Sequence, residues 1–258
     1  TMAKGLNAGR AAENGVLAAK LAANGFTASQ NIFDDPMGFF AAACGDRVER
    51  RLLRFGKPFF FAQPGVAIKL YPCAGVLHPA LDILIKLRAR HRIDAAAVSN
   101  VSIELDAEAA RPLVYDRPLS GLESKFSLPF AAAVALVDGA AGLVQFTDPR
   151  VSDPAIGRLM KRVTLLRREP AKKAPRSGIA TAVEIELKNG SVLGARDVIA
   201  RGHPLRPAAR TEVEDKFIHC AHGILPPRQI RQLLKSFWRV DRAPSIGAWL
   251  RPLRAARR

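Results

Sequence analysis

The stretch Ala67-Ile68-Lys69-Leu70-Tyr71-Pro72-Cys73, followed closely by His78-Pro79-Ala80-Leu81-Asp82, joins two kinds of structure. The alternating apolar run predicts a short strand over residues 66–71, and His-Pro predicts the first turn of a helix. Such a corner can hold the Lys69 ammonium over a cleft, beside the backbone N–H groups and the imidazole of the first helical turn. This arrangement suits a carboxylate. Strand alternation would place Tyr71 on the same face as Lys69.

Upstream of this corner the pattern is helical. Residues 8–24 carry alanine and valine at helical spacing and are followed by Gly25, which predicts an alanine-rich, tightly packed helix with a glycine end. Asp34-Asp35-Pro36 is typical of a helix start and leads into residues 37–44.

Downstream of the corner, strand and helix patterns alternate. Helical spacing covers residues 79–91 and 127–137, and strand-like runs cover residues 98–105, 163–166, 181–187 and 191–199. The last two runs predict a hairpin that turns at Lys188-Asn189-Gly190. The Asn-Gly pair favours a type I′ turn. From Pro207 the pattern returns to helices, the first of them with Thr211 as its cap. We expect a small α/β domain with antiparallel strands, followed by helices.

Five motifs occur in one order along the chain. They are Lys4–Ala12, the corner at residues 67–82, Lys125–Phe130, Gln145–Asp148 and Glu214–Phe217. In this order and spacing they resemble the MmgE/PrpD family, the cofactor-free 2-methylcitrate dehydratases and cis-aconitate decarboxylases. The resemblance covers nearly the whole chain but only the second half or so of a family member. We therefore expect a truncated fragment that is inactive by itself.

The resemblance also implies a large helical domain interrupted by an α/β lid, with the active site between them. We predict a mixed α and α+β fold, in which an all-α domain is discontinuous, lacks its N-terminal part and is interrupted by a smaller α/β lid domain with antiparallel strands. The expected domains are residues 1–64 for part of the helical domain, 65–206 for the lid, and 207–258 for the return to the helical domain and a basic tail.

Lys4 and Asn7 lie in a segment that resembles the family's Lys-x-Leu-His-x-Gly-x-Ala-Ala motif, whose lysine faces the substrate. Lys4 is therefore a candidate catalytic residue, although an exposed lysine near a chain end is the alternative. Asn7 stands where the motif has histidine. Its amide can hydrogen-bond a substrate carboxylate or hydroxyl but cannot titrate, so it is a candidate for binding and not for proton transfer.

Lys69 is the stronger catalytic candidate, because it lies in an otherwise apolar or aromatic run; the alternative is an edge-strand lysine whose head reaches solvent. Tyr71, His78 and Ser127 are candidate substrate-binding residues. A helix-cap or domain-interface role is the alternative for His78, and for Ser127 helix capping is the first expectation. Cis-aconitate decarboxylases carry a histidine just after Pro-x, where this chain has Ala74, and this favours dehydration over decarboxylation.

Cofactor signals are weak. The three cysteines, Cys44, Cys73 and Cys220, are widely spaced, which argues against a disulfide framework and against an iron–sulfur cluster. His219 and His222 have a helical spacing that suits a metal, but no carboxylate is placed to complete the site. We predict no cofactor and no metal.

The formal net charge of +17 is concentrated in two segments, since residues 158–176 carry +7 and residues 228–258 carry +8. Aromatic content of 7% offers no platform for stacking bases, so a solvated basic rim is favoured over a nucleic-acid surface. The sequence contains no long apolar run and no signal-peptide pattern at Thr1, and we expect a cytoplasmic protein with no membrane partner.

The leading hypothesis is a lyase of the MmgE/PrpD type that acts on a small polycarboxylate such as 2-methylcitrate, and we expect it to form a homodimer. Within the family the alternative is a polycarboxylate isomerase or epimerase, which would use the same cations. Outside it, the alternative is a non-catalytic, basic nucleic-acid-binding module.

Overall fold

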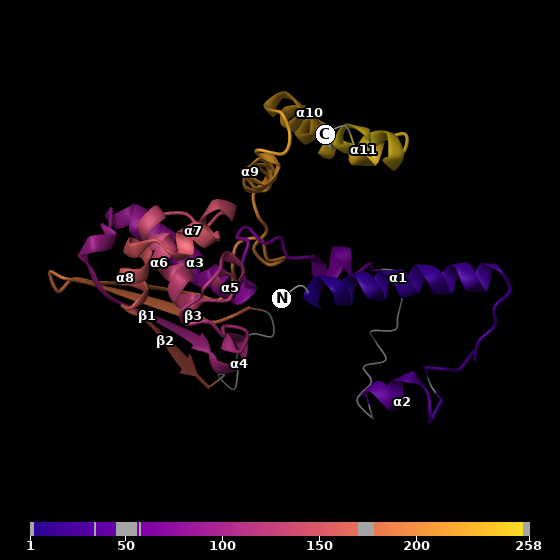
Figure 1. The fold of residues 1–258 in the computed structure, drawn as a ribbon, viewed down its shortest axis with the longest axis horizontal. Helices are drawn as coiled ribbons and strands as arrows, with labels where there is room; N and C mark the ends of the chain where they lie inside the picture. The colour runs from indigo at the N-terminus through magenta and orange to yellow at the C-terminus, as the bar shows by residue number, and fades with distance from the viewer. Residues whose placement is uncertain (1–2, 34, 45–55, 57, 170–177, 255–258) are drawn as a thin grey trace. The chain divides into compact units, whose positions relative to one another are not determined.

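The computed structural model describes residues 3–33, 35–44, 56, 58–169 and 178–254. The chain divides into two compact units, residues 1–63 and residues 64–258 (Figure 1). The predicted third segment, residues 207–258, lies in the second unit, and its assignment to a discontinuous helical domain stays a prediction. Asp34 of the predicted helix start, residues 170–176 of the first basic segment and residues 255–258 of the second lie outside the described residues.

The described part of the first unit includes the α-helices α1 (Ala3–Ala23) and α2 (Phe39–Cys44). Gly25 has a φ of 86°, as expected of a glycine that ends a helix. Before α2 the Asp35 carboxylate accepts a hydrogen bond from the backbone N–H of Met37, at 2.9 Å. A short irregular helix, Phe61–Gly65, spans the boundary between the units. The predicted helices of this region are therefore present.

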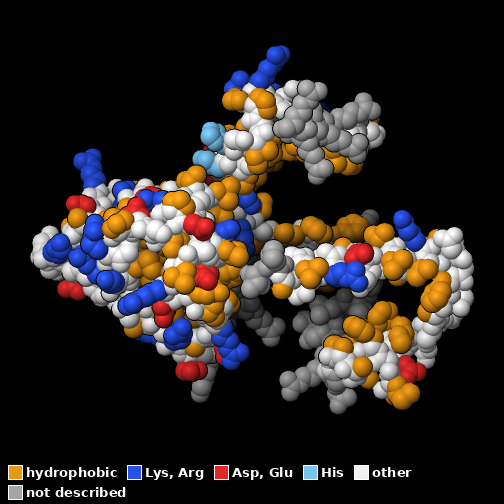
Figure 2. All heavy atoms as spheres, in the orientation of Figure 1, with side chains coloured by type: hydrophobic (Ala, Val, Ile, Leu, Met, Phe, Trp, Pro, Cys, Tyr) orange, Lys and Arg blue, Asp and Glu red, His pale blue; other side chains and the backbone are white. Residues whose placement is uncertain are grey.

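The expected tight packing of the alanine-rich helix is wrong. No residue of α1 is buried, and Leu6 and Val16 are 63% and 58% exposed. Figure 2 shows hydrophobic side chains along this helix. Alanine favours a helix through its intrinsic propensity, without requiring burial. The sequence pattern therefore predicted that α1 is a helix but not whether other residues pack against it.

The second unit is built on a four-stranded sheet of order β2-β1-β3-β4. Its strands are β1 (Val98–Asp106), β2 (Val163–Arg168), β3 (Thr181–Leu187) and β4 (Val192–Asp197). The β1–β3 and β3–β4 pairs are antiparallel, but β1 and β2 are parallel. The sheet is therefore mixed, and the prediction of antiparallel strands is wrong for β2. The long helical connection between β1 and β2 permits the parallel pairing, which a tight turn could not.

Two helices pack on the sheet, α3 (His78–His91) and α6 (Leu128–Asp138), and a third, α8 (Pro154–Met160), packs against α6. Helix α3 contacts β3 and β4, while α6 contacts β2 and the two other helices (Figure 1). Helix α6 is buried from Leu128 to Leu136, consistent with a helix that is apolar on all sides. Val101, Ile103 and Leu105 of β1 are fully buried, as their alternation predicts, and Val98 is also buried because the register shifts between Val98 and Asn100.

Three short α-helices and three 3₁₀ turns complete the connections around the sheet. They are α4 (Ala107–Ala110), α5 (Gly121–Ser124), α7 (Asp148–Val151) and the 3₁₀ turns at Gly75–Leu77, Ala95–Ala97 and Leu143–Gln145. The opposite side of the sheet carries Ser102, Glu104, Glu184 and Arg196, which line a shallow groove. A sheet with one apolar and one polar face is typical of α+β proteins.

The β3–β4 hairpin forms as predicted, but its turn differs. The N–H of Gly190 donates to the Leu187 carbonyl, which makes Lys188 and Asn189 the central residues of the turn. A type I′ turn requires positive φ at both central residues, whereas Gly190, just after them, is the residue with positive φ. The Asn189 side chain also accepts from the N–H of Ser191, at 3.0 Å. The loop therefore has three residues and ends in a left-handed glycine.

The chain ends in α9 (Arg210–Ala221), α10 (Pro227–Phe237), a 3₁₀ turn at Val240–Arg242 and α11 (Ile246–Arg254). Phe217, Phe237 and Trp249 link the three helices, with ring centroids 4.7 and 4.8 Å apart. Thr211 is not the cap of α9: the helix begins one residue earlier, and Glu212 accepts from the N–H of Ala209 instead. Among the described helices, none combines the length and apolarity needed to cross a bilayer.

Candidate active site

The run before Pro72 is not a strand. Residues 66–70 form a loop whose Ile68 N–H donates to the Gly202 carbonyl at 2.8 Å. An added Cβ at Gly202 would lie 2.1 Å from the Ile68 carbonyl oxygen, so a glycine is required for this approach. Among the described residues no strand pairs with this run, and Lys69 and Tyr71 do not share a face as predicted, because Tyr71 is buried and Lys69 is exposed.

Lys69 nevertheless lies at the corner as expected. Its Nζ donates to the Cys73 carbonyl at 2.9 Å, so the side chain folds back toward the turn that leads into α3. A Cβ added at Gly75 would be 3.9 Å from the Lys69 Cε, and the lysine stem therefore lies over this turn. The ammonium keeps two further N–H donors for a ligand.

A second lysine reaches the same corner. The Lys125 carbonyl accepts from the N–H of Ala74 at 2.9 Å, which fixes residues 124–127 beside the turn. Burial raises the pKa of the Cys73 thiol to about 12, although the charges of Lys69 and Lys125 act to lower it. The thiol is therefore protonated at neutral pH and is unsuited to act as a nucleophile.

His78 opens α3 and is 3% exposed. Its ring meets Tyr71 edge-on, with centroids 5.2 Å apart, and its Nε2 has no hydrogen-bond partner. Burial, together with the charge of Lys69, lowers the pKa of His78 to about 4. The imidazole is thus neutral at physiological pH, and Nε2 can hydrogen-bond a ligand without adding a further charge.

Tyr71 belongs to a buried polar network that sequence reasoning missed. Its hydroxyl donates to Asp82 Oδ1 at 2.7 Å and accepts from Arg201 Nη2 at 2.8 Å. The Arg201 Nε also donates to Asp82 Oδ1 at 2.8 Å, and the Arg201 Nη1 forms an ion pair with the Glu212 carboxylate. Burial and the Asp82 charge raise the pKa of Tyr71. The hydroxyl is engaged on both sides, which favours a positioning role beneath the corner.

One signal could have revealed part of this network. Asp82 lies between Leu81 and Ile83 on the apolar face of a helix and is 1% exposed. A carboxylate at such a position requires a cationic partner. The partner, Arg201, lies 119 residues away along the chain, so the sequence pattern could not name it.

Ser127 is fully buried and forms the N-cap of α6. Its Oγ accepts from the N–H of Phe130 at 3.2 Å, which is the capping role expected first. Its further role in substrate binding stays a prediction. Lys4 and Asn7 lie exposed, three residues apart on α1 and so on one side of that helix. Because α1 belongs to the other unit, their membership of the site also stays a prediction.

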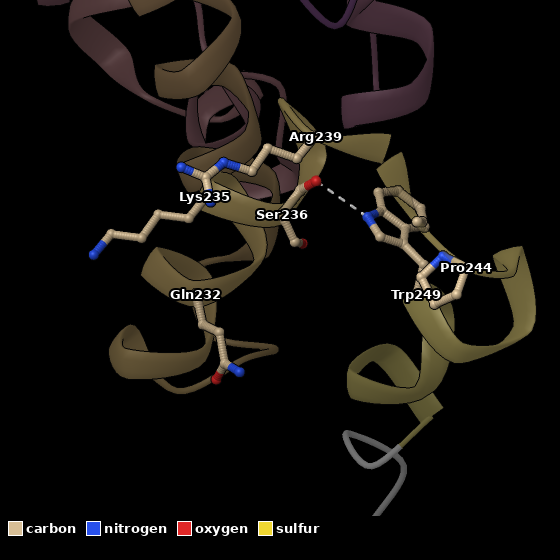
Figure 3. Close-up of a pocket in the computed structure, with 7 residues that line it drawn as sticks. Gln232, Lys235, Ser236, Arg239, Pro244 and Trp249 are labelled. Atoms are coloured by element: carbon tan, nitrogen blue, oxygen red, sulfur yellow. Dashed lines mark hydrogen bonds between the residues drawn. The ribbon is translucent and has the colours of Figure 1, made fainter. Parts of the chain in front are cut away.

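The other chemical candidates do not form sites in the described part of the chain. His222 caps the end of α9, and no group of three or more His, Cys, Asp or Glu side chains there is placed to hold a metal. A pocket of about 440 Å³ lies between α10 and α11 (Figure 3). It contains Lys235, Arg239 and Trp249, whose indole N–H donates to the Ser236 carbonyl, but none of the predicted site residues.

The fold and the corner define a two-part, MmgE/PrpD-type protein. Residues 71–240 match the MmgE/PrpD C-terminal domain, and residues 1–51 match the MmgE/PrpD N-terminal domain. The chain belongs to the MmgE/PrpD family.

Its curated relatives include cis-aconitate decarboxylases. The human protein is 24% identical over 241 residues, which cover 91% of this chain and 49% of the relative. The protein of Aspergillus terreus is 26% identical over 206 residues, covering 74% and 42%, and the mouse protein is 26% identical over 223 residues, covering 84% and 45%. The chain thus spans about half the length of the curated relatives it matches.

Proposed function

We propose that the whole protein is a lyase that acts on a small polycarboxylate. The observation that carries this proposal is the corner at residues 69–78, where Lys69 and Lys125 approach one turn and a neutral His78 begins the helix that follows. Two cations beside a helix start favour an anion with several carboxylates. The names of the curated relatives agree with this substrate class.

In our proposal the corner supplies charge and orientation. In a dehydration, a base takes a proton from the carbon next to a carboxylate, the C–O bond breaks, water leaves and a C=C bond forms. Lys69 and Lys125 hold a carboxylate and stabilise the negative charge that develops on it. His78 Nε2 hydrogen-bonds the same ligand while remaining neutral. Proton transfer is assigned to groups that other parts of the whole protein contribute.

We favour dehydration of a substrate such as 2-methylcitrate. Ala74 is buried at the corner and cannot exchange a proton, whereas the family resemblance implies a histidine at this position in a decarboxylase. Decarboxylation is the second candidate, and the curated relatives favour it. In that reaction the C–C bond to one carboxylate breaks, CO₂ leaves and a proton replaces it.

Product analysis separates the two reactions. The complete protein would be incubated in parallel with 2-methylcitrate and with cis-aconitate, and the new double bond and released CO₂ would be measured. Dehydration predicts an unsaturated product from 2-methylcitrate without CO₂. If cis-aconitate releases CO₂ stoichiometrically, decarboxylation takes the place of dehydration as the proposed reaction. Absence of both reactions and of any polycarboxylate binding would overturn the lyase proposal.

A further inference from the structure

A second cationic pocket lies at the far end of α3. A cavity of about 440 Å³ is lined by Arg88, Arg158, Arg162 and Lys188. Arg88 is ten residues beyond His78 on α3, which places the pocket about 15 Å along the helix from the corner. The MmgE/PrpD motifs quoted from the sequence contain none of these four residues.

The cations of this pocket lack acidic partners. Among the described residues, the observed ion pairs involve other arginines, and none includes these four side chains. Asp94 is the carboxylate that lines the pocket, and one of its oxygens accepts from the N–H of Ala96 at 3.0 Å. The lining therefore has a formal excess of positive charge, which attracts anions.

Two of the arginines are held in place by the fold. The Arg88 Nε and Nη2 donate to the Leu136 and Val137 carbonyls at 2.6 and 3.2 Å, at the end of α6. Arg162 donates to the Val98 carbonyl at the start of β1. Each guanidinium carries five N–H donors, so both retain donors after these contacts. Arginines fixed by backbone carbonyls lose little side-chain freedom when they bind an anion.

The other two cations are free to close on a ligand. Arg158 and Lys188 are exposed, and they come from α8 and from the β3–β4 turn. The backbone N–H of Lys188 donates to the Ala97 carbonyl at 2.8 Å, which fixes the turn beside the pocket. Ile93, Val137 and Leu159 supply an apolar part of the lining.

We propose that this pocket binds a small anion with at least two negative charges, of the phosphate or carboxylate kind. Arginine pairs with both kinds of oxygen anion in a bidentate manner, and the apolar lining accommodates the body of an organic ligand. The site is distinct from the corner, and the proposal does not rest on the lyase assignment.

The test measures binding of inorganic pyrophosphate and, separately, of citrate to the full 258-residue chain by calorimetry at low ionic strength. The double variant Arg158→Ala/Lys188→Ala removes two exposed cations that make no described side-chain contact, so we expect it to fold. It should weaken binding by at least about tenfold. A matched control, Arg90→Ala/Lys161→Ala, removes two exposed cations outside the lining and should change binding by less than about twofold.

The two probes distinguish the ligand classes: preferential binding of pyrophosphate supports a phosphate site, and preferential binding of citrate supports a carboxylate site. In a Lys69→Met background, Arg158→Ala/Lys188→Ala should weaken pyrophosphate binding by the same factor as in the wild type, which separates this pocket from the proposed active site. Absence of binding by both anions, or equal weakening by the two double variants, would overturn the proposal. Circular dichroism of each variant establishes that it is folded.

Discussion

At the scale of single residues, Lys69 is the side chain on which the proposed function depends most. Its Nζ is anchored to the Cys73 carbonyl but keeps two donors. In the complete enzyme, Lys69→Met should lower kcat/KM at least tenfold, about 1.4 kcal/mol, with little change in melting temperature. Steady-state kinetics tests this, with Lys86→Met, an exposed lysine on α3, as control. Unchanged kinetics would remove Lys69 from the site.

His78 should give the protein a distinct dependence of stability on pH. Its pKa is lowered from 6.5 to about 4 in the folded state, so between these values the unfolded chain binds the extra proton. The free energy of unfolding should therefore fall as pH falls from 6.5 to 4, by on the order of 3 kcal/mol from this residue. Urea titrations across this pH range should show a smaller fall in the free energy of unfolding for His78→Gln than for the wild-type protein.

The control for this experiment is His91, which is exposed at the other end of α3. His91→Gln should leave the pH profile of the wild-type protein unchanged. If His78→Gln and wild type lose stability in parallel between pH 6.5 and 4, the buried, neutral imidazole is not the source of the effect.

At the scale of elements, Arg201 joins the loop before α9 to α3. Removing it leaves the Asp82 carboxylate, which is 1% exposed, with Tyr71 and one backbone N–H as its partners. Arg201→Met should destabilise the protein by about 3 kcal/mol, since an uncompensated buried charge is costly. Arg210→Met, which removes an exposed pair with Glu214, should have a much smaller effect.

A double-mutant cycle measured by chemical denaturation isolates the interaction. Combining Arg201→Met with Asp82→Asn should cost clearly less than the sum of the single variants, because each removes the same pair. Additive effects would show that Arg201 and Asp82 stabilise the protein independently.

At the scale of the whole molecule, we expect a catalyst that needs no metal. Activity of the complete protein should survive prolonged treatment with a chelator, because the proposed charge stabilisation comes from lysines. Elemental analysis of the purified protein should find no stoichiometric iron or zinc. Loss of activity together with a bound metal, and recovery on adding it back, would contradict the cofactor-free prediction.

Local patterns predicted much of the second unit. The apolar run of α6, with Ser127 before it and Gly139 after it, defines a helix with both ends. The alternation of Val101, Ile103 and Leu105 predicts a half-buried strand, and β1 is one. The sequence also predicted that Lys69 and His78 lie at one corner, because a lysine before Pro-Cys and a His-Pro helix start are local features, and their roles in a site stay predictions.

The sequence by itself determined where most of the helices and the four strands of the sheet occur, because spacing, caps and turns act over a few residues. Only the tertiary structure decided the parallel pairing of β2, the loop at residues 66–70 and the partners of Tyr71. Each depends on segments far apart in the chain: Gly202 holds Ile68, and Arg201 neutralises Asp82. Such contacts are set by burial and charge in three dimensions, and no local pattern encodes them.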